Sequence, residues 1–484
     1  MPAQPGVREA AQTDGPGSAP PRKTGPDAST PAPATAAAPE SPAASNSDSA
    51  DQPALPSPPA TFTLTPQEQE QIAAVGLRQH SGRHVTVISD LADPQPLEEL
   101  AQTFDAAVPL WCRYFEVDPA KVATWRVAAC LMHDKSPFVR CGLYPEDLPP
   151  FPHGYSRGAQ LWIYEQPSDY YRRHLLLHEG THIFMQQCLQ GAGPPWYMEG
   201  IAEYLATHRW ENGQLTLAVM PRTKEEFPYW GRVKIIRDET AAARALTLND
   251  IMNYDAQAHL RNEPYGWCWA AVAFLDQHPQ SQAAFRELQK HTAEEPRAFN
   301  RRLQEGIGVH WPAVQADWQV FVAECDYGYD VARAAAVHLP PRALPPEGTS
   351  VRIAADRGWQ STGLRLEAGR SYFVTARGQY LVARSPRPWP CEPDGVTIEY
   401  HRGQPLGKLL YAIVGEPAKP ADGTAAGESA KRTTPLASPQ PLGAQGQIVA
   451  AEGGTLYLKI NEAASGLADN EGELSVEIQP LPAP

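Results

Sequence analysis

The stretch YRRHLLLHEGTHIFMQQ, residues 171–187, contains two histidines and a glutamate in the spacing H-E-x-x-H. Its apolar residues recur at helical spacing, which predicts an α-helix. Because one helical turn separates His178 from His182, both side chains point the same way and can bind one metal ion. Glu179 projects past that ion, where its carboxylate can accept a proton from an attacking water. A solvated helix with ordinary histidines is the alternative, but chance placement rarely gives this pattern.

A second helical pattern follows at PPWYMEGIAEYLA, residues 194–206. Prolines suit its first turn, and Glu199 and Glu203 lie four positions apart on one face. Glu199 would complete a site of two histidines and one glutamate with a fourth position open to water. Glu203 would contact a ligand imidazole and fix its tautomer, with an ordinary acidic surface as an equally weighted alternative. We expect His174 behind the ligands or at the surface, because it matches no motif position.

Composition divides the chain into three regions. Residues 1–62 are mostly Pro, Ala, Ser, Gly, Thr and Asp, so they cannot bury enough surface to offset the entropy of ordering. We predict a disordered arm there, a mixed α+β domain at 63–340 and an all-β sandwich at 341–484. A low-complexity insertion at about 416–445 interrupts the last region, and we expect it to form a mobile surface loop.

The middle region mixes strand and helix signals, which predicts a small mixed sheet plus helices. The predicted strands are 84–91, 125–133 and 158–165. The predicted helices are 96–116, 168–190, 195–209, 264–278 and 280–306. The last region instead shows short β-type runs separated by Gly, Pro and Asp, which indicates a sandwich or jelly roll.

HEGTH followed by WYMEGIAEYLA resembles the gluzincin zinc metallopeptidases, the thermolysin and aminopeptidase N group, and their bacterial peptidase-MA-like relatives. The resemblance implies that His178, His182 and Glu199 hold zinc. Glu179 would serve as general base and acid, activating a zinc-bound water, and Glu203 would stand behind the ligands. The implied reaction is hydrolysis of peptide bonds.

Two further features follow from this resemblance. Gluzincins lay the substrate along an edge strand that precedes the zinc helix, and residues 158–165 stand in that place. The oxyanion needs a donor besides zinc, and Tyr265 lies where aminopeptidase-like members present a tyrosine. Tyr254 and His259 are competitors, and core packing of Tyr265 is an equally weighted alternative. The G-x-M-E-N element that recognises a free N-terminus is absent, which favours an endopeptidase.

The C-terminal runs PDGVTIEY, PLGKLLYAIVG and LYLKINEAASGLADNEGELSVEI resemble bacterial calcium-dependent galactose-binding lectins. Glu462, Asp469 and Asn470 would match metal-contacting positions, and Ca²⁺ takes about 6 to 8 oxygen ligands. An acidic turn between strands is an equally weighted alternative. The module would bind glycan or protein. Candidate aromatic residues for stacking on sugars are Tyr380, Trp389 and Tyr400, although core packing is the stronger expectation for each.

The net charge of -14, with no Lys/Arg-rich run, argues against nucleic acid as a partner. No apolar run approaches the ~20 residues of a transmembrane segment, and no signal peptide is visible. The seven cysteines form no C-x-x-C pair, although Cys130 and Cys141 could bridge a hairpin. We expect an extracellular or periplasmic location, because peptidases joined to lectin-like modules usually act there.

The leading prediction is therefore a zinc-dependent peptidase, an endopeptidase by preference, that acts on peptide or protein substrates and carries an accessory β-sandwich. A non-enzymatic glycan-binding or adhesion protein with a structural or inactive metal site is the first alternative. A hydrolase of another amide or ester is the second, because such a site does not by itself select peptides.

Overall fold

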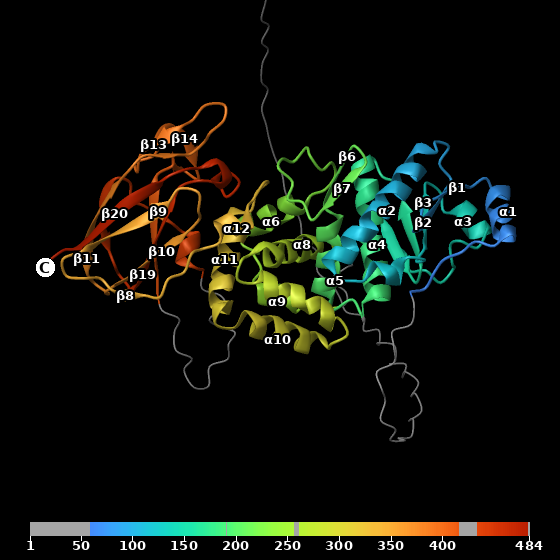
Figure 1. The fold of residues 1–484 in the computed structure, drawn as a ribbon, viewed down its shortest axis with the longest axis horizontal. Coiled ribbons are helices and arrows are strands. Elements are labelled where there is room, and N and C mark those ends of the chain that lie inside the picture. The colour runs from blue at the N-terminus through green and yellow to red at the C-terminus, as the bar shows by residue number, and fades with distance from the viewer. Residues whose placement is uncertain (1–58, 190, 256–260, 416–432, 483–484) are drawn as a thin grey trace, which may run out of the picture. The chain divides into compact units, whose positions relative to one another are not determined.

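The computed structural model describes residues 59–189, 191–255, 261–415 and 433–482, all within the compact unit Pro56–Pro484. Helices with small mixed sheets come first along the chain, and a β-rich region follows (Figure 1). The predicted mixed α+β class is confirmed at this level. The galactose-binding or jelly-roll type of the β-rich region stays a prediction.

A five-stranded sheet in the order β1-β2-β3-β5-β4 forms the framework of the first region. The three inner strands run parallel, and the two edge strands β1 and β4 are antiparallel to their neighbours. Every residue of β2 and β3 is buried, as parallel strands covered on both faces require. The strands are β1 (Arg78–Ser81), β2 (Val85–Ser89), β3 (Val127–Met132), β4 (Gly154–Arg157) and β5 (Gln160–Tyr164).

The expected edge strand at 158–165 is wrong, because β5 lies between β3 and β4 and β4 forms the edge. A tight turn at Gly158 causes the difference. Gly158 has a φ of 63°, a left-handed conformation that favours glycine. The turn folds the chain back so that Arg157 pairs with Gln160, and it leaves β5 covered on both sides.

Helices cover both faces of this sheet (Figure 1). α2 and α4 share one apolar core with it, and α1 and α3 share another on the opposite face. Val87 and Ile88 enter opposite cores because successive strand side chains alternate. The helices are α1 (Pro66–Ala74), α2 (Gln95–Tyr114), α3 (Ser136–Arg140), α4 (Asp169–Cys188), α5 (Pro195–Ala206), α6 (Arg232–Ala241), α7 (Leu248–Met252), α8 (Asn262–Gln277), α9 (Gln282–Glu287), α10 (Pro296–Ile307), α11 (Trp311–Glu324) and α12 (Val331–Ala334).

Four predicted helices agree closely with α2, α4, α5 and α8, but the fifth, 280–306, is wrong in length. α9 ends at Glu287, and α10 begins only at Pro296. The physical reason is that proline has no backbone N–H to donate and fits a helix only in its first turn. Pro296 therefore starts a new helix instead of continuing the old one.

Two sheets of the β-rich region, in the orders β17-β16-β19-β10-β8 and β18-β11-β20-β9, enclose one apolar cluster. Leu364 and Leu456 enter it from the first sheet, and Val374 and Val476 enter it from the second. Alternation of buried and exposed residues along β11 and β20 matches the predicted strand pattern. The strands are β8 (Arg342–Ala343), β9 (Thr349–Ala354), β10 (Gln360–Leu366), β11 (Ser371–Arg377), β16 (Leu409–Val414), β17 (Gln440–Pro441), β18 (Gln445–Val449), β19 (Gly454–Ile460) and β20 (Glu473–Pro480).

Three small hairpins complete the strands. They are β6 (His208–Glu211) with β7 (Gln214–Leu217), β12 (Tyr380–Leu381) with β13 (Pro390–Cys391), and β14 (Val396–His401) with β15 (Gln404–Leu406). The predicted arm at 1–62 lies outside the described residues except for its last four positions, and so do residues 416–432 of the predicted insertion. Residues 433–445 of that insertion contain β17 and the buried Leu436.

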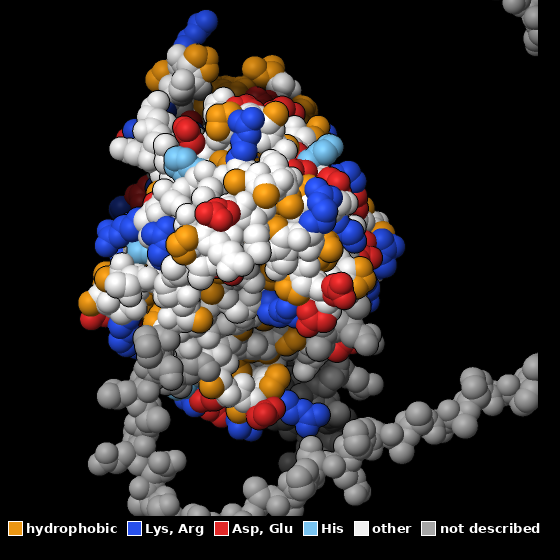
Figure 2. All heavy atoms as spheres, turned by 90° about the vertical axis from the view of Figure 1, so that its right-hand side faces the viewer, with side chains coloured by type: hydrophobic (Ala, Val, Ile, Leu, Met, Phe, Trp, Pro, Cys, Tyr) orange, Lys and Arg blue, Asp and Glu red, His pale blue; other side chains and the backbone are white. Residues whose placement is uncertain are grey.

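The charged surface at one end of the chain and the cysteines can also be compared with the predictions. Acidic and basic side chains alternate over the end of the molecule that carries α1 and α3 (Figure 2). All seven cysteines lie in the described residues and are free, so Cys130 and Cys141 form no bridge. Among the described residues, no helix has both the length and the apolar character needed to cross a membrane.

Candidate metal centre

Two neighbouring helices bring the predicted ligands together. His178 and His182 lie on α4, with their Nε2 atoms 3.0 Å apart. Oε2 of Glu199, on α5, lies 3.5 Å from each of these nitrogens. Zinc ligands at about 2.0–2.1 Å from the ion in a tetrahedron stand roughly 3.4 Å from one another, so these donor atoms fit one divalent ion. All three side chains are buried.

The donor atoms are also matched electrostatically to a cation. Burial opposes a charged imidazole, but contacts with Glu199 and Glu203 outweigh it and raise the pKa of His178 to about 10. Burial also opposes a charged Glu199, yet the charge of His182 and the contacts with both histidines hold the pKa of Glu199 below its usual range. A divalent ion would replace the protons that these groups share, because metal ligands bind in their deprotonated forms.

Glycines in both motifs allow the helices to approach closely. A Cβ at Gly180 would stand 2.8 Å from the rings of Phe104 and Trp111 on α2. A Cβ at Gly200 would stand 2.6 Å from the carbonyl oxygen of Cys268 on α8. The glycines of H-E-G-T-H and M-E-G-I-A therefore allow close packing of α4 against α2 and of α5 against α8. This packing fixes the positions of the two helices that carry His178, His182 and Glu199.

Glu179 faces the edge strand β4. Its side chain is buried and approaches Gly154, where a Cβ would stand only 2.7 Å from Oε1. Glycine at position 154 therefore leaves the room that this carboxylate occupies. The Glu179 carboxylate therefore lies between α4 and the edge strand β4.

Glu203 lies beside His178, on the side of its ring away from Glu199. Its Oε1 lies 3.2 Å from Nδ1 of His178 and 3.5 Å from Nε2 of His174. Arg232, the first residue of α6, donates two hydrogen bonds to the same carboxylate, at 2.7 and 3.0 Å. Burial opposes the charge on Glu203, but Arg232 and His174 hold its pKa well below the usual range.

A second trio, His174, His178 and Glu203, also brings donor atoms within 4.8 Å of one another. It is the weaker metal candidate because the Glu203 carboxylate is already neutralised by Arg232. His174 is fully buried. Of the two positions expected for it, behind the ligands or at the surface, the second is therefore excluded. Its Nδ1 lies 3.0 Å from the carbonyl oxygen of Ala206, so it tethers the end of α5.

Tyr265, on the first turn of α8, adjoins the centre. Its ring lies 6.1 Å from the ring of His178, and the Arg232 guanidinium lies 5.7 Å from the centre of the tyrosine ring. Burial and the nearby carboxylates, Glu199 first, raise the pKa of Tyr265 far above its usual value. The competitor Tyr254 packs against the core cluster instead. The other competitor, His259, lies outside the described residues.

The predicted calcium ligands lie near one another in the β-rich region, but they do not form a group of three carboxylates or histidines. Oε1 of Glu462 accepts from the N–H of Ala463, and Nδ2 of Asn470 donates to the carbonyl of Ala355. Oδ2 of Asp469 accepts from a backbone N–H. Within the described ranges, the groups of three or more His, Cys, Asp or Glu side chains suited to one ion are the two trios above.

The three candidate sugar-stacking residues differ in exposure. Tyr380 is buried, so core packing is confirmed for it, and Trp389 is partly buried against the same core. Tyr400 is 59 % exposed and projects from β14. Only Tyr400 presents enough ring surface to remain a candidate for contact with sugar.

Two residues of the site were not found from sequence. Arg232 carries no motif, and it reaches Glu203 from a helix that lies 29 residues further along the chain. No sequence pattern distinguishes Gly154 from the other glycines of the chain. Its position shortly before the predicted strand at 158–165 is the one signal that could have pointed to it. Both matter only because distant segments pack together.

The fold and the site together define an α+β chain with a buried group of two histidines and one glutamate suited to a metal ion. No family model and no curated protein matches the chain. The EclA N-terminal domain, a PllA-like lectin, is 19% identical over 28% of this chain and 100% of its own, with a TM-score of 0.20.

A second solved structure is IMPa from Pseudomonas aeruginosa in complex with an O-glycopeptide. It is 10% identical over 82% of this chain, with a TM-score of 0.17. This chain spans only 37% of the length of that IMPa chain. Likeness at these scores shows no function for this chain.

Proposed function

We propose that the protein is a zinc-dependent peptidase, an endopeptidase by preference, that hydrolyses peptide bonds at the centre of His178, His182 and Glu199. The observation that carries this proposal is the convergence of these three ligand atoms within 4.8 Å of one another, next to the motif glutamate Glu179. In a purely structural zinc site, a fourth protein ligand would fill the last coordination position. Among the described residues, this group contains three candidate ligands, His178, His182 and Glu199.

A zinc ion held there would polarise a substrate carbonyl and acidify a water molecule beside it. The Glu179 carboxylate would take the proton from the attacking water and deliver it to the leaving amine. The phenol of Tyr265 would donate a hydrogen bond to the oxyanion, because its raised pKa keeps it protonated at neutral pH. Glu203 would hold the Nδ1 side of His178 and so orient its ring.

The edge strand β4 supports a peptide as the substrate. Tyr164 N–H bonds to the carbonyl of His153, and the register pairs Tyr155 with Trp162. Hydrogen-bonded positions alternate in an antiparallel pair, so the backbone groups of Gly154 and Ser156 point away from β5. In the described part of the chain no strand pairs with this outer edge, and an extended peptide could add to it beside Glu179.

The test is cleavage of a degenerate peptide mixture by the zinc-loaded full chain, with products identified by mass spectrometry. We expect cleavage at internal bonds, its loss on treatment with a chelator and its recovery with zinc. Glu179→Gln should keep one zinc per chain and lower kcat by about 10² to 10⁴. A wild type that binds zinc but cleaves no peptide would contradict the proposal and favour the non-enzymatic alternative, or hydrolysis of another amide or ester.

We also propose that the β-rich region is an accessory module that binds calcium and, through it, glycan. The supporting observation is that Oε2 of Glu462 and Oδ1 of Asn470 are buried without a hydrogen-bond partner in the described chain. Buried oxygens without a partner are costly, and a calcium ion would satisfy them. Titration calorimetry of the full chain should show calcium binding that Glu462→Gln weakens and the exposed-site control Glu347→Gln does not.

Such a module would bring the enzyme to glycoproteins, and we propose that it acts in an extracellular or periplasmic compartment. Glycan-array binding by the full chain, with and without calcium, tests the module directly. If the array shows no glycan binding either with or without calcium, the β-rich region would be a structural or protein-docking element. Cell fractionation tests the compartment.

A further inference from the structure

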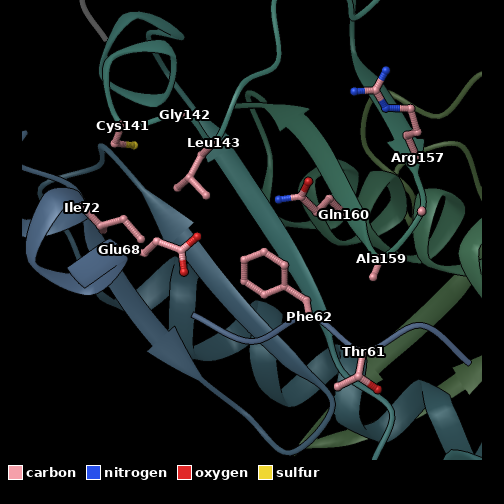
Figure 3. Close-up of a pocket in the computed structure, with 11 residues that line it drawn as sticks. Thr61, Phe62, Glu68, Ile72, Cys141, Gly142, Leu143, Arg157, Ala159 and Gln160 are labelled. Carbon is pink, nitrogen blue, oxygen red and sulfur yellow. The ribbon is translucent and has the colours of Figure 1, made fainter. Parts of the chain in front are cut away.

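A pocket of about 510 Å³ opens at the far end of the edge strand β4 (Figure 3). Arg157, the last residue of β4, and the turn at Gly158 and Ala159 form one wall. The beginning of β5, helix α1 and the segment after α3 supply the others. The volume is in the range of about 300–1,000 Å³ that is usual for ligand pockets.

Strand β4 runs from the neighbourhood of Glu179 to the pocket. Strand β4 starts at Gly154, next to the Glu179 carboxylate, and ends three residues later at Arg157. At about 3.4 Å per residue, these positions are roughly 10 Å apart. A peptide paired with β4 over this length would therefore place one residue at the reacting bond and a residue three or four positions away at the pocket.

The side chains that face the pocket favour a cation with an apolar stem. Figure 3 shows the ring of Phe62, the amide of Gln160 and the carboxylate of Glu68 directed toward a common space. Leu143 and Ile72 add apolar surface. Lysine and arginine have this character, because their aliphatic stems pack on apolar groups while their charge seeks a carboxylate or a ring face.

The lining carries one positive and one negative charge, and only the negative one lacks a partner of opposite charge in the described chain. Arg157 and Glu68 are the charged residues of the lining, and Arg157 is neutralised by two hydrogen bonds to Asp147, outside it, at 2.9 and 3.2 Å. Glu68 has no cationic partner in the described chain. Its Oε2 accepts from the N–H and hydroxyl of Thr65, at 2.7 and 2.8 Å, which lowers its pKa and keeps it ionised.

We propose that this pocket binds the lysine or arginine side chain of a peptide substrate, three or four residues N-terminal to the bond that is cleaved. The N-terminal direction follows from antiparallel pairing with β4, which is the more stable arrangement and puts the peptide's N-terminal side over Arg157. The inference rests on the proposed peptidase function and specifies the substrate class.

The test uses the full chain with Glu179→Gln, which holds a peptide without cleaving it. A fluorescent peptide that the wild type cleaves is made with lysine, norleucine or glutamate at each N-terminal position, and binding is followed by polarisation. We expect lysine at the third or fourth position to bind about five- to tenfold more tightly than norleucine. Glutamate there should bind more weakly than norleucine.

Adding Glu68→Gln should remove this difference without harming the helix, because glutamine also serves at this position of a capping box. Glu70→Gln, on the same helix but outside the pocket, is the matched control and should leave the difference intact. Equal affinity for lysine and norleucine at every position would overturn the inference while leaving the peptidase standing. A zinc-loaded wild type that cleaves no peptide would remove the proposed function, and this inference with it.

Discussion

Oε1 of Glu203 lies 3.2 Å from Nδ1 of His178, while Nε2 of the same imidazole faces Glu199. A carboxylate on the Nδ1 side holds the ring proton there and leaves Nε2 with its lone pair for an ion. Arg232 holds the Glu203 carboxylate from behind through two hydrogen bonds. The orientation of the His178 ring therefore depends on an arginine that contacts Glu203 and lies outside the trio of His178, His182 and Glu199.

The first prediction concerns this arginine. Arg232→Gln should weaken zinc binding about 10- to 100-fold, measured by competition with a chromogenic chelator, because Glu203 would no longer hold His178. It should also lower the free energy of unfolding by about 3 to 5 kcal/mol, since it leaves a buried carboxylate without its cation. Arg237→Gln, on the same helix in an exposed ion pair, should change neither quantity. Unchanged zinc affinity in a folded Arg232→Gln variant would contradict this role.

The second prediction concerns the space beside the general base. Gly154→Ala places a methyl group 2.7 Å from Oε1 of Glu179, which is too close for two atoms that are not bonded, so the carboxylate must move. Because a shift of about 1 Å can cost about 10²-fold in rate, kcat should fall by about 10- to 100-fold with zinc content unchanged. Gly415→Ala, where the new methyl meets nothing closer than 3.7 Å, is the control. Full activity of Gly154→Ala would show that Glu179 acts from another position.

The third prediction separates a donor from a packed ring at Tyr265. Tyr265→Phe keeps the aromatic contact with His178 and removes only the hydroxyl, so zinc affinity and stability should stay close to wild type. Loss of an oxyanion donor should lower kcat about 10²- to 10³-fold. Tyr254→Phe should have no such effect, because Tyr254 packs against the core cluster. Equal rates for both variants would assign Tyr265 to packing.

The fourth prediction is a loss of stability in acid. Burial, aided by the charge of Arg173, lowers the pKa of His208 to about 3, from an ordinary 6.5. Between pH 6.5 and 3, His208 is therefore protonated in the unfolded chain but neutral in the folded chain. The contribution of His208 to the free energy of unfolding is complete above pH 6.5 and falls as the pH drops toward 3. The loss from this group is on the order of 5 kcal/mol. His174, whose pKa burial also lowers, acts in the same direction.

His208→Asn tests this directly, because asparagine can still donate to the carbonyl of Ala206, which His208 contacts at 2.8 Å, but does not titrate. The variant should start from a lower stability at about pH 7.5 and lose less of it in acid, measured by chemical unfolding from about pH 7.5 to 4.5. His133→Asn, at an exposed histidine, is the control. An unchanged slope of stability against pH would contradict the assignment.

Local spacing explains why the core of the site was predictable. His178 and His182 lie one helical turn apart, as do Glu199 and Glu203, and the α-helix itself sets the relative directions of such pairs. The burial pattern along β2 and β3 likewise follows from their own apolar residues. In contrast, the split between α9 and α10 was missed because a helical pattern continues across Pro296.

The amino-acid sequence by itself determined α2, α4, α5 and α8, the two motif pairs and the order of an α+β region followed by a β-rich one, because these depend on neighbours within a few residues. Only the tertiary structure decided that β4 is the sheet edge, that Gly154 makes room for Glu179, that Arg232 secures Glu203, and that Glu68 and Phe62 face one pocket. Gly154 and Glu179, like Arg232 and Glu203, lie on separate elements, and Leu143 and Gln160 of the pocket come from segments distant from Phe62 and Glu68. The packing of the whole core therefore sets these distances, rather than the geometry of one element.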